Sequence, residues 1–341
     1  MTEQIVECVP NFSEGKNTAI IDEITAEISR TEGVTLLGVD SGEDFNRSVV
    51  TIVGKPDSVL DAVVSASKKA IELIDMTKHT GEHARMGAVD VVPFIPIRGI
   101  SIDECVKLSE EYAFRMSSSI GLPVYLYAES ARHEERKLLP NIRKGEYESF
   151  EEKISLPQWK PDFGPASFIP KSGVTATGAR NFLIAYNVNL NTDDKALANK
   201  IAGKIRTSGV LMKDEHGNKI LDEKGIAKRI PGKFTNLQGA GWMYNQDVAQ
   251  VSMNLLNFSE TGLYEVTTEI ENLATELGLT VTAGEIVGLV PLNAILDAGR
   301  LYNNGDAEDS ILISKAIEGL KLDVLYDFNP EERIIELSAG L

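Results

Sequence analysis

At 341 residues, of which 43% are hydrophobic, the chain is long for a single hydrophobic core, so we expect two domains. Its formal net charge of -17 argues against nucleic acid as a partner, because affinity for the phosphate backbone comes mainly from lysine and arginine. The apolar runs are too short to span a membrane and the acidic amino terminus does not resemble a signal peptide, so we expect a soluble, cytoplasmic protein without a membrane partner.

The first half of the chain predicts the order strand, helix, strand, strand, helix, strand. Ser13 or Asn17 is the expected cap of the first helix, because their side-chain oxygens can accept a hydrogen bond from a free backbone N–H. The second helix has apolar residues at helical spacing from Val59 to Ile74. The predicted strands cover residues 5–9, 34–40, 47–53 and 89–95, and the predicted helices cover residues 18–30 and 57–76.

A helix at 103–120 and a strand at 124–127 follow, and then a segment rich in proline, glycine and serine at 161–180. This segment is the best candidate for a linker. Beyond it the same order of elements returns. The predicted strands there cover residues 182–190, 236–243, 248–256 and 281–290, and the predicted helices cover residues 194–207 and 262–277. The charged insertion at 214–225 is expected to form a surface hairpin or a mobile loop, with His216 exposed and inert.

Two successive βαββαβ patterns predict a structural duplication. We expect an α/β (α+β) fold of two ferredoxin-like βαββαβ subdomains that pack with a ligand groove between them. The boundary is placed so that the subdomains cover residues 1–181 and 182–341. Clefts between domains are preferred sites for small molecules, and the glycine-rich segment before the boundary is expected to line this one.

The segment KHTGEHARMGAVDVVPFIP, residues 78–96, is dense in chemically active side chains. It includes His79, His83, Arg85 and Asp90, and it joins a predicted helix to a predicted strand. Rigid elements on both sides of a turn commonly hold catalytic groups. From the spacing alone, a pair of ordinary surface histidines is the alternative.

His79, Glu82 and His83 match the pattern H-x-x-E-H, with which inverted zinc metalloproteases place two imidazoles on one helix face. Gly81 argues against a helix there, because glycine inside a helix costs about 0.8 to 1 kcal/mol relative to alanine. Neither Cys8 nor Cys105 has a C-x-x-C partner. The sequence also lacks the P-loop, the G-x-S-x-G elbow and the dinucleotide-binding G-x-G-x-x-G pattern.

Seven segments, in order along the chain, carry a family resemblance. They are VECVPNFSEGKN (6–17), VDSGEDFNRSVVTIVG (39–54), GEHARMGAVDVVPFIP (81–96), PVYLYAESAR (123–132), PDFGPASFIPKSGVTATGARNFLIAYNVNL (161–190), VAQVSMNLLNF (248–258) and IVGLVPLNAILDA (286–298). These segments resemble those of the glutamate formimidoyltransferase family, the formiminotransferases. The resemblance covers both halves of the chain.

The resemblance implies transfer of the formimino group of N-formimino-L-glutamate to N5 of tetrahydrofolate, which yields 5-formiminotetrahydrofolate and L-glutamate in histidine degradation. It also implies two ferredoxin-like subdomains, tetrahydrofolate as co-substrate, no metal and a homodimer. In animals this region is fused to a cyclodeaminase domain. Here we expect the stand-alone form, because the sequence ends at Leu341.

By the same resemblance, the catalytic histidine of the GEHPRMGA motif falls on His83. Ala84 stands where the family usually has proline, which is expected to loosen the turn because proline restricts the residue before it. The folate-binding segment falls on Gly164, Pro165, Ala166, Ser167, Phe168, Ile169, Pro170, Lys171, Ser172 and Gly173.

The expected chemistry assigns roles to a few side chains. His83 is expected to take a proton from N5 and to give one to the leaving glutamate nitrogen, with His79 as its support. Asp40 is expected to act in catalysis by orienting the imidazole or holding a substrate nitrogen, with an ordinary turn carboxylate as the alternative. Arg47 and Arg85 are expected to bind substrate carboxylates, because a guanidinium matches a carboxylate with two parallel hydrogen bonds.

Two other functions stay open at this point. One is formyl transfer or the processing of 5-formyltetrahydrofolate, which a comparison of formyl and formimino donors would separate. The other is a folate-binding protein without catalysis, against which the intact His83, Arg85 and Asp90 argue.

Overall fold

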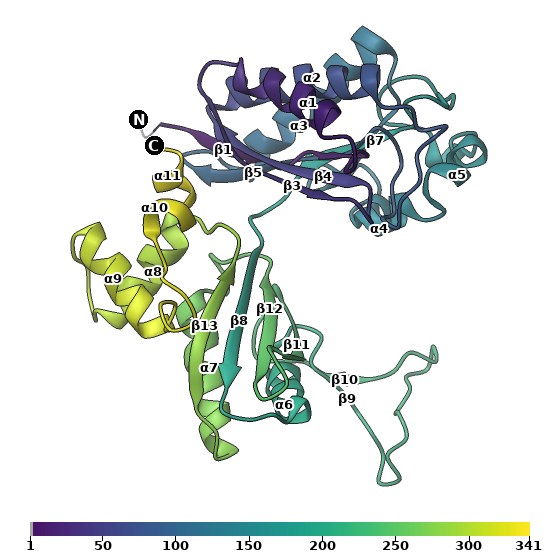
Figure 1. Ribbon diagram of the computed structural model, residues 1–341. Coiled ribbons are helices and arrows are strands. Elements are labelled where there is room, and N and C mark those ends of the chain that lie inside the picture. The colour runs from purple at the N-terminus through teal and green to yellow at the C-terminus, as the bar shows by residue number, and fades with distance from the viewer. Residues whose placement is uncertain (1–2) are drawn as a thin grey trace. The chain divides into compact units, whose positions relative to one another are not determined.

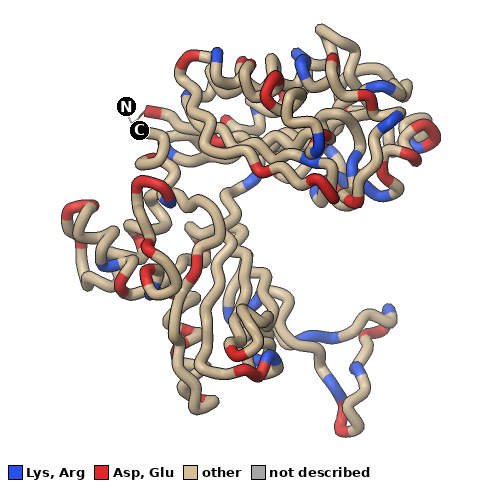
Figure 2. Tube along the Cα trace, viewed as in Figure 1, with Lys and Arg blue, Asp and Glu red and all other residues tan. Residues whose placement is uncertain are grey.

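The computed structural model describes residues 3–341. The chain divides into two compact units, with the division between Asn181 and Phe182, and each unit has its own sheet and helices (Figure 1). No helix within residues 3–341 combines the length and the apolar character needed to cross a membrane. Acidic and basic residues are interspersed along the chain in both units (Figure 2).

A seven-stranded sheet forms the base of the first unit. Its strands are β1 (Ile5–Cys8), β2 (Asn11–Phe12), β3 (Val34–Gly42), β4 (Arg47–Gly54), β5 (Val89–Arg98), β6 (Val124–Ala128) and β7 (Thr175–Ala179). β1 and β2 both lie between β4 and β5 and pair antiparallel with each. Pro10 separates these two short strands, since proline has no N–H to give to the ladder. β3 forms one edge beside β4, while β7 and β6 extend the sheet beyond β5 in parallel.

Long helices cover one face of this sheet (Figure 1). They are α1 (Thr18–Ser29), α2 (Pro56–Leu73) and α3 (Ile102–Ile120). The expected cap Asn17 is confirmed, because its side chain accepts a hydrogen bond from the N–H of Ala19 at 3.2 Å. α3 begins with a capping box between Ser101 and Glu104 and ends at Gly121 in the left-handed conformation. The apolar core of the unit lies between these helices and the sheet.

The second face of the sheet is covered by short elements along β5, β7 and β6. These elements are η1 (Glu134–Arg136), α4 (Leu139–Arg143), α5 (Glu146–Lys153) and η2 (Pro157–Trp159). Ile142 of α4 and Phe150 of α5 pack with Tyr125 and Tyr127 of β6 in a second, smaller core. The sheet of the first unit is therefore buried from both sides in this region, next to the loops that carry His79 and His83.

The expected linker at 161–180 is partly wrong, because its last residues form the buried strand β7 between β5 and β6. The sequence TATGA has small and polar residues where a buried strand usually has large apolar ones. The threonine hydroxyls form hydrogen bonds within the sheet: Thr175 donates to the carbonyl of Val89 and Thr177 to that of Val92, both at 2.7 Å. Composition therefore predicted a loop where tertiary pairing produces a strand.

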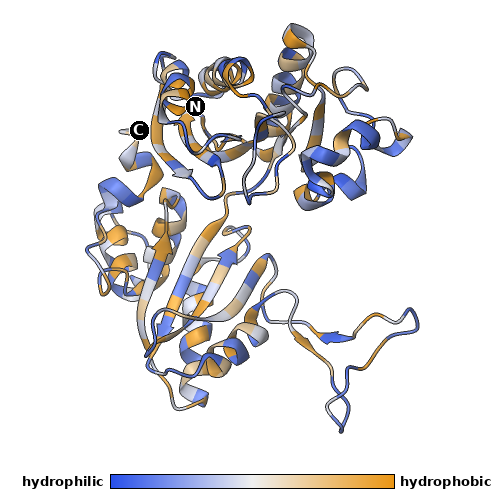
Figure 3. Ribbon diagram, turned by 45° about the vertical axis from the view of Figure 1, so that its right-hand side comes forward, coloured by the Kyte–Doolittle hydropathy of each residue, from blue (hydrophilic) through white to orange (hydrophobic). Residues whose placement is uncertain are grey.

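The second unit has a four-stranded antiparallel sheet in the order β11, β12, β8, β13. Its strands are β8 (Ile184–Leu190), β11 (Leu237–Met243), β12 (Ala249–Leu255) and β13 (Val281–Val287), and its first helices are α6 (Lys195–Ile205) and α7 (Leu263–Glu276). Along β8, Ile184, Tyr186 and Val188 are buried, whereas Ala185 and Asn187 between them are half-buried. In Figure 3, hydrophobic and hydrophilic bands alternate along the strands of this unit, and this alternation is that of a sheet with one buried face. It places the apolar side chains on the face that α6 and α7 cover.

Two further features complete the second unit. Helices that the sequence analysis left unassigned follow β13: α8 (Leu292–Tyr302), α9 (Asp309–Leu320), α10 (Pro330–Arg333) and α11 (Ile335–Ser338). An arm at residues 209–232 projects from the unit on the two-stranded ribbon of β9 (Val210–Leu211) and β10 (Arg229–Ile230), as Figures 1 and 3 show. The side chains of Asp214 and Asp222 close two successive turns in this arm, and His216 is exposed there. The expected surface hairpin is confirmed.

Candidate active site

Three loops of the first unit meet at Asn46: the one after β2, the one between β3 and β4, and the one before β5. The Asn46 side chain accepts a hydrogen bond from the N–H of Gly15 at 3.0 Å and donates to the carbonyl of Thr80 at 2.8 Å. Its backbone carbonyl lies 2.9 Å from Nε2 of His79. Asn46 has a φ of 48°, a left-handed conformation that asparagine tolerates better than most residues. One buried residue therefore fixes all three loops to one another.

Glycines allow these loops to approach as closely as they do. A Cβ atom on Gly15 would lie 2.4 Å from the carbonyl oxygen of Gly42, and one on Gly81 would lie 2.4 Å from that of Phe45. Real Cβ atoms do not come so near to a backbone oxygen. Gly15 and Gly81 are thus required by packing at this site.

His83 lies partly buried in the loop before β5 and contacts an arginine. Arg47, the first residue of β4, places Nη1 against Nε2 of His83. Because a guanidinium can only donate, Nε2 is the acceptor, and the proton of the neutral imidazole is on Nδ1. Nδ1 is buried and has no hydrogen-bond partner within residues 3–341.

The surroundings of His83 keep its imidazole neutral. Burial, and after it the positive charges of Arg47 and Arg143, together lower the pKa of His83 to about 4. A histidine with this pKa is unprotonated at neutral pH. The side chain is therefore in the charge state that a general base needs.

Arg143 and Asp90 form a second pair beside this histidine. Arg143, the last residue of α4, donates Nη2 to the Oδ2 atom of Asp90 in β5. Asp90 is buried, and its other oxygen accepts a hydrogen bond from the N–H of Met86 at 2.9 Å. Asp90 is thus a buried counter-charge in a group that also contains Arg47, Arg143 and His83.

Asp40 does not contact the imidazole. It lies exposed on β3, opposite Val49 of β4, and no hydrogen bond joins it to His83 in the described part of the chain. Its negative charge instead acts on Arg47, where it raises the pKa of the guanidinium against the larger opposite effect of burial. The structure therefore brings His83 together with Arg47 and not with Asp40.

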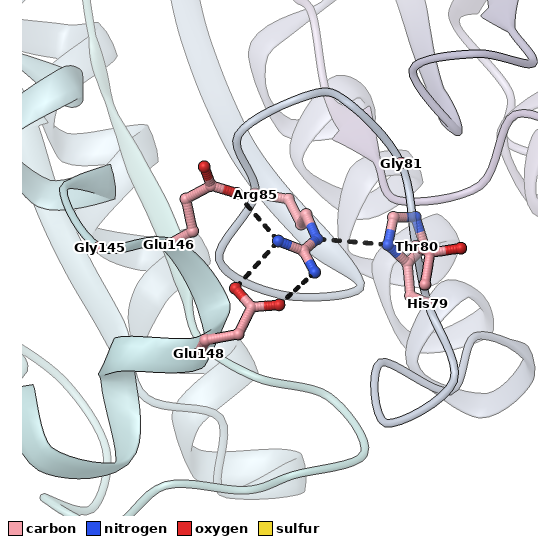
Figure 4. A pocket seen from close by; sticks show the side chains of 7 residues that line it. All are labelled: His79, Thr80, Gly81, Arg85, Gly145, Glu146 and Glu148. Atoms are coloured by element: carbon pink, nitrogen blue, oxygen red, sulfur yellow. Dashed lines mark hydrogen bonds and ion pairs between the residues drawn. The ribbon is translucent and has the colours of Figure 1, made fainter.

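A pocket of about 520 Å³ lies on the other side of the loop. Figure 4 shows its lining, which comprises His79, Thr80, Gly81, Arg85, Gly145, Glu146 and Glu148. The guanidinium of Arg85 is buried there and points toward both glutamates: it donates to Glu148 at 2.5 and 3.1 Å and to Glu146 at 2.9 Å. Arg85, which was expected to bind a substrate carboxylate, is already paired with two carboxylates of its own chain.

His79 is held between Arg85 and Asn46. Its Nδ1 accepts a hydrogen bond from Nε of Arg85 at 3.4 Å, so its proton is on Nε2 and points to the carbonyl of Asn46. Burial is the main cause that lowers the pKa of His79. This imidazole is therefore neutral and occupied at both nitrogens, as a supporting residue would be.

The segment at 164–173 is open at its start and anchored at its end. Residues 164–167 are exposed, whereas Ser172 and Gly173 are buried. The N–H of Ala88 donates to the carbonyl of Ser172 at 2.8 Å, and a Cβ on Gly173, whose φ is 67°, would lie 2.3 Å from the carbonyl oxygen of Met86. This segment is thus packed directly against the loop that carries His83.

Aromatic and lysine side chains hold the middle of the same segment. The ring of Phe168 lies 5.2 Å from that of Tyr147, whose hydroxyl donates to the carbonyl of Pro170 at 2.6 Å. The ammonium of Lys171 donates to the carbonyl of Glu72 at 2.8 Å, in the last turn of α2. Lys171 therefore serves to attach the segment to the unit.

The metalloprotease alternative is wrong. Residues 77–88 contain no helix, so His79 and His83 do not share a helix face, and they point to different partners. Among residues 3–341, no group of three or more His, Cys, Asp or Glu side chains has a metal-binding arrangement.

Two residues of the site, Asn46 and Arg143, were not identified from the sequence. Asn46 ends the turn-rich stretch SGEDFN, and an asparagine at that place is a recognisable signal for a left-handed residue. Arg143 lies in a stretch without periodicity, and no sequence signal connects it to Asp90, 53 residues earlier.

Comparison with known proteins covers both units. The model of the N-terminal subdomain of the formiminotransferase domain matches residues 5–180, and the formiminotransferase domain model matches residues 185–339. The glutamate formimidoyltransferase of Streptococcus pyogenes serotype M1 is 42% identical over 88% of this chain and 93% of its own length. That of Thermoplasma acidophilum is 39% identical over 91% of this chain and 97% of its own.

Longer relatives match as well. The formimidoyltransferase-cyclodeaminase of Rattus norvegicus is 46% identical over 98% of this chain, and the match spans 59% of the length of that relative. Since the family models match nearly all of both units, the chain belongs to the formiminotransferase family.

Proposed function

We propose that this protein is a glutamate formimidoyltransferase. It transfers the formimino group of N-formimino-L-glutamate to N5 of tetrahydrofolate and yields 5-formiminotetrahydrofolate and L-glutamate, in histidine degradation. The family match over both units supports the reaction. The observation that carries the proposal in the structure is a neutral His83 at a group of arginines, which suits a base acting beside an anionic substrate.

The two units are proposed to be the N-terminal (1–181) and C-terminal (182–341) formiminotransferase subdomains, each with a ferredoxin-like core. The strand order supports this proposal. In the first unit β1 lies between β5 and β4 with β3 at the edge, and in the second β8 lies between β13 and β12 with β11 at the edge. Both orders are those of a βαββαβ fold with antiparallel neighbours. The ligand groove between the subdomains and the homodimer stay predictions.

The proposed reaction needs one proton acceptor that later becomes a donor. N5 of tetrahydrofolate attacks the formimino carbon, and the C–N bond to glutamate breaks after the tetrahedral intermediate has formed. His83 accepts the proton that N5 loses and returns it to the leaving nitrogen of glutamate. Its low pKa suits both steps, because the imidazole is unprotonated before the attack and its proton is readily given up afterwards.

Other side chains are proposed to bind the substrates. Arg47 is assigned to a carboxylate of the glutamate moiety. Arg85 can take this role only if Glu146 and Glu148 release it. Asp40, which is exposed, is assigned to a substrate nitrogen and not to the imidazole. The segment 164–173 is assigned to folate. Its residues 164–167 are exposed, and its end at Ser172 and Gly173 is anchored beside the His83 loop.

An assay with the purified protein tests the function. Tetrahydrofolate and N-formimino-L-glutamate are supplied, and the product is detected as 5,10-methenyltetrahydrofolate after acid treatment. We expect turnover by the wild type, a loss of about 10² to 10⁴ in kcat for His83→Ala, and normal turnover for His216→Ala, which changes an exposed histidine on the arm. Unchanged turnover in His83→Ala would remove this residue from the mechanism. A reaction with N-formyl-L-glutamate but not with the formimino donor would replace the proposed reaction by formyl transfer.

A further inference from the structure

We infer that Arg47 is a latch that masks the basic nitrogen of His83 until a carboxylate of the substrate draws the guanidinium away. The inference rests on the proposed function, because it describes how the base of that reaction is controlled.

A neutral imidazole has one lone pair that can accept a proton, and in this structure that lone pair is occupied. Nη1 of Arg47 donates to Nε2 of His83, which places the ring proton on Nδ1. Nδ1 is itself buried. In this arrangement neither nitrogen of His83 can take a proton from a substrate. The contact with Arg47 must therefore break before His83 acts as a base.

Arg47 is held less firmly than the arginines around it. Arg143 is paired with Asp90, and Arg85 is paired with Glu146 and Glu148. Arg47 has no ion-pair partner within residues 3–341. Its guanidinium is hydrogen-bonded to the neutral imidazole of His83, and the negative charges of Asp90 and Asp40 act on it without an ion pair. Of these guanidiniums, Arg47 is the one whose best hydrogen-bond acceptor is uncharged.

A carboxylate is the ligand group that would displace the imidazole. A carboxylate carries a full negative charge and can accept two parallel hydrogen bonds from a guanidinium, whereas the neutral imidazole is uncharged and accepts only one. The proximity of Arg143 adds to the attraction, because its positive charge also acts at this position. The substrate glutamate moiety carries carboxylates. Binding of the glutamate moiety would free Nε2 of His83. It would also move the positive guanidinium of Arg47 away from the imidazole.

Nuclear magnetic resonance of the ¹⁵N-histidine-labelled protein tests the latch directly. His83 is assigned from the spectrum of His83→Gln, and L-glutamate, the reaction product, serves as the ligand. We expect the proton on Nδ1 in the free protein. L-glutamate should shift the Nε2 resonance of His83 and raise its pKa toward the ordinary value, while His216 stays unchanged.

Two variants separate a latch from a merely structural contact. Arg47→Met lacks every donor, so His83 should titrate at a higher pKa than in the wild type and should not respond to L-glutamate. Arg115→Gln, which changes a half-buried arginine on α3 that is paired with Asp61 and Glu111, should behave as the wild type does. A proton on Nε2 in the free wild type, or no change at His83 with L-glutamate present, would overturn the latch. Failure of the transferase assay with an intact NMR response would instead overturn the proposed reaction alone.

Discussion

His79 and His83 are neighbours in sequence, yet they carry their protons on opposite ring nitrogens. His79 donates from Nε2 to Asn46 and accepts at Nδ1 from Arg85, whereas His83 accepts at Nε2 from Arg47. Sequence motifs identified both histidines as candidates. They could not give the proton positions, because these depend on partners 33 and 36 residues away.

The pKa of His83 predicts how turnover depends on pH. The pKa of His83 is lowered to about 4, so this imidazole, the proposed base, stays unprotonated as the pH falls from neutrality and becomes protonated only near that value. We expect kcat/KM for the formimino donor, which reports the free enzyme, to change less than twofold between about pH 7.5 and 5.5. An ordinary histidine, with a pKa of about 6.5, would lose close to tenfold in this range. Initial rates over this range, with circular dichroism as the control for folding, distinguish the two.

The elements of this chain differ in how far sequence could predict them. α2 and α7 have apolar residues at helical spacing, and β4 alternates, so local pattern and tertiary structure agree. β7 was missed, because its neighbours β5 and β6 come from distant parts of the chain and its composition is that of a loop. The anchored end of the segment 164–173 was equally hidden, since its packing against Met86 is a long-range contact.

A pair of glycine substitutions tests this anchoring. Gly173 and Gly121 have nearly the same φ, 67° and 69°. A Cβ on Gly173 would strike the backbone of Met86, whereas one on Gly121 meets nothing within 4 Å. Gly121→Ala should therefore cost about 1 kcal/mol of unfolding free energy from backbone strain alone and leave turnover intact.

Gly173→Ala should cost more than Gly121→Ala and should also lower turnover, because it pushes the segment 164–173, proposed to bind folate, away from the His83 loop. Urea unfolding and the transferase assay measure both effects on the same preparations. Equal effects of the two substitutions would show that the contact with Met86 is unimportant.

On the scale of the whole molecule, the chain repeats one order of elements and adds different parts to each copy. The repeated βαββαβ order was readable because strands and helices alternate with clear periods in both halves. The additions were harder to predict: α4 and α5 in the first unit and α8 to α11 in the second have no counterpart in the repeat. The arm was predicted as a surface hairpin or a mobile loop, because its Asp and Gly residues are those that tight turns require.

The arm should be dispensable for folding. Most side chains between Met212 and Lys228 are exposed, and the hydrogen bonds of the segment are largely internal to it. Replacing residues 212–228 by Asn-Gly, a two-residue turn that suits a hairpin, should change the free energy of unfolding by less than about 0.5 kcal/mol. Urea denaturation monitored by circular dichroism provides the measurement. A loss of several kcal/mol would mean that the arm is part of the folded core.

The three loops that Asn46 joins also determine which motion can release His83. Arg47 is the next residue after Asn46, and its backbone is fixed both by pairing with Gly42 and by the loops that Asn46 joins. In the inferred mechanism, release of His83 therefore requires rotation of the half-buried Arg47 side chain and not a collective motion of loops, which belongs to the microsecond-to-millisecond range. We therefore expect that no loop movement limits the unmasking of His83 in the proposed reaction.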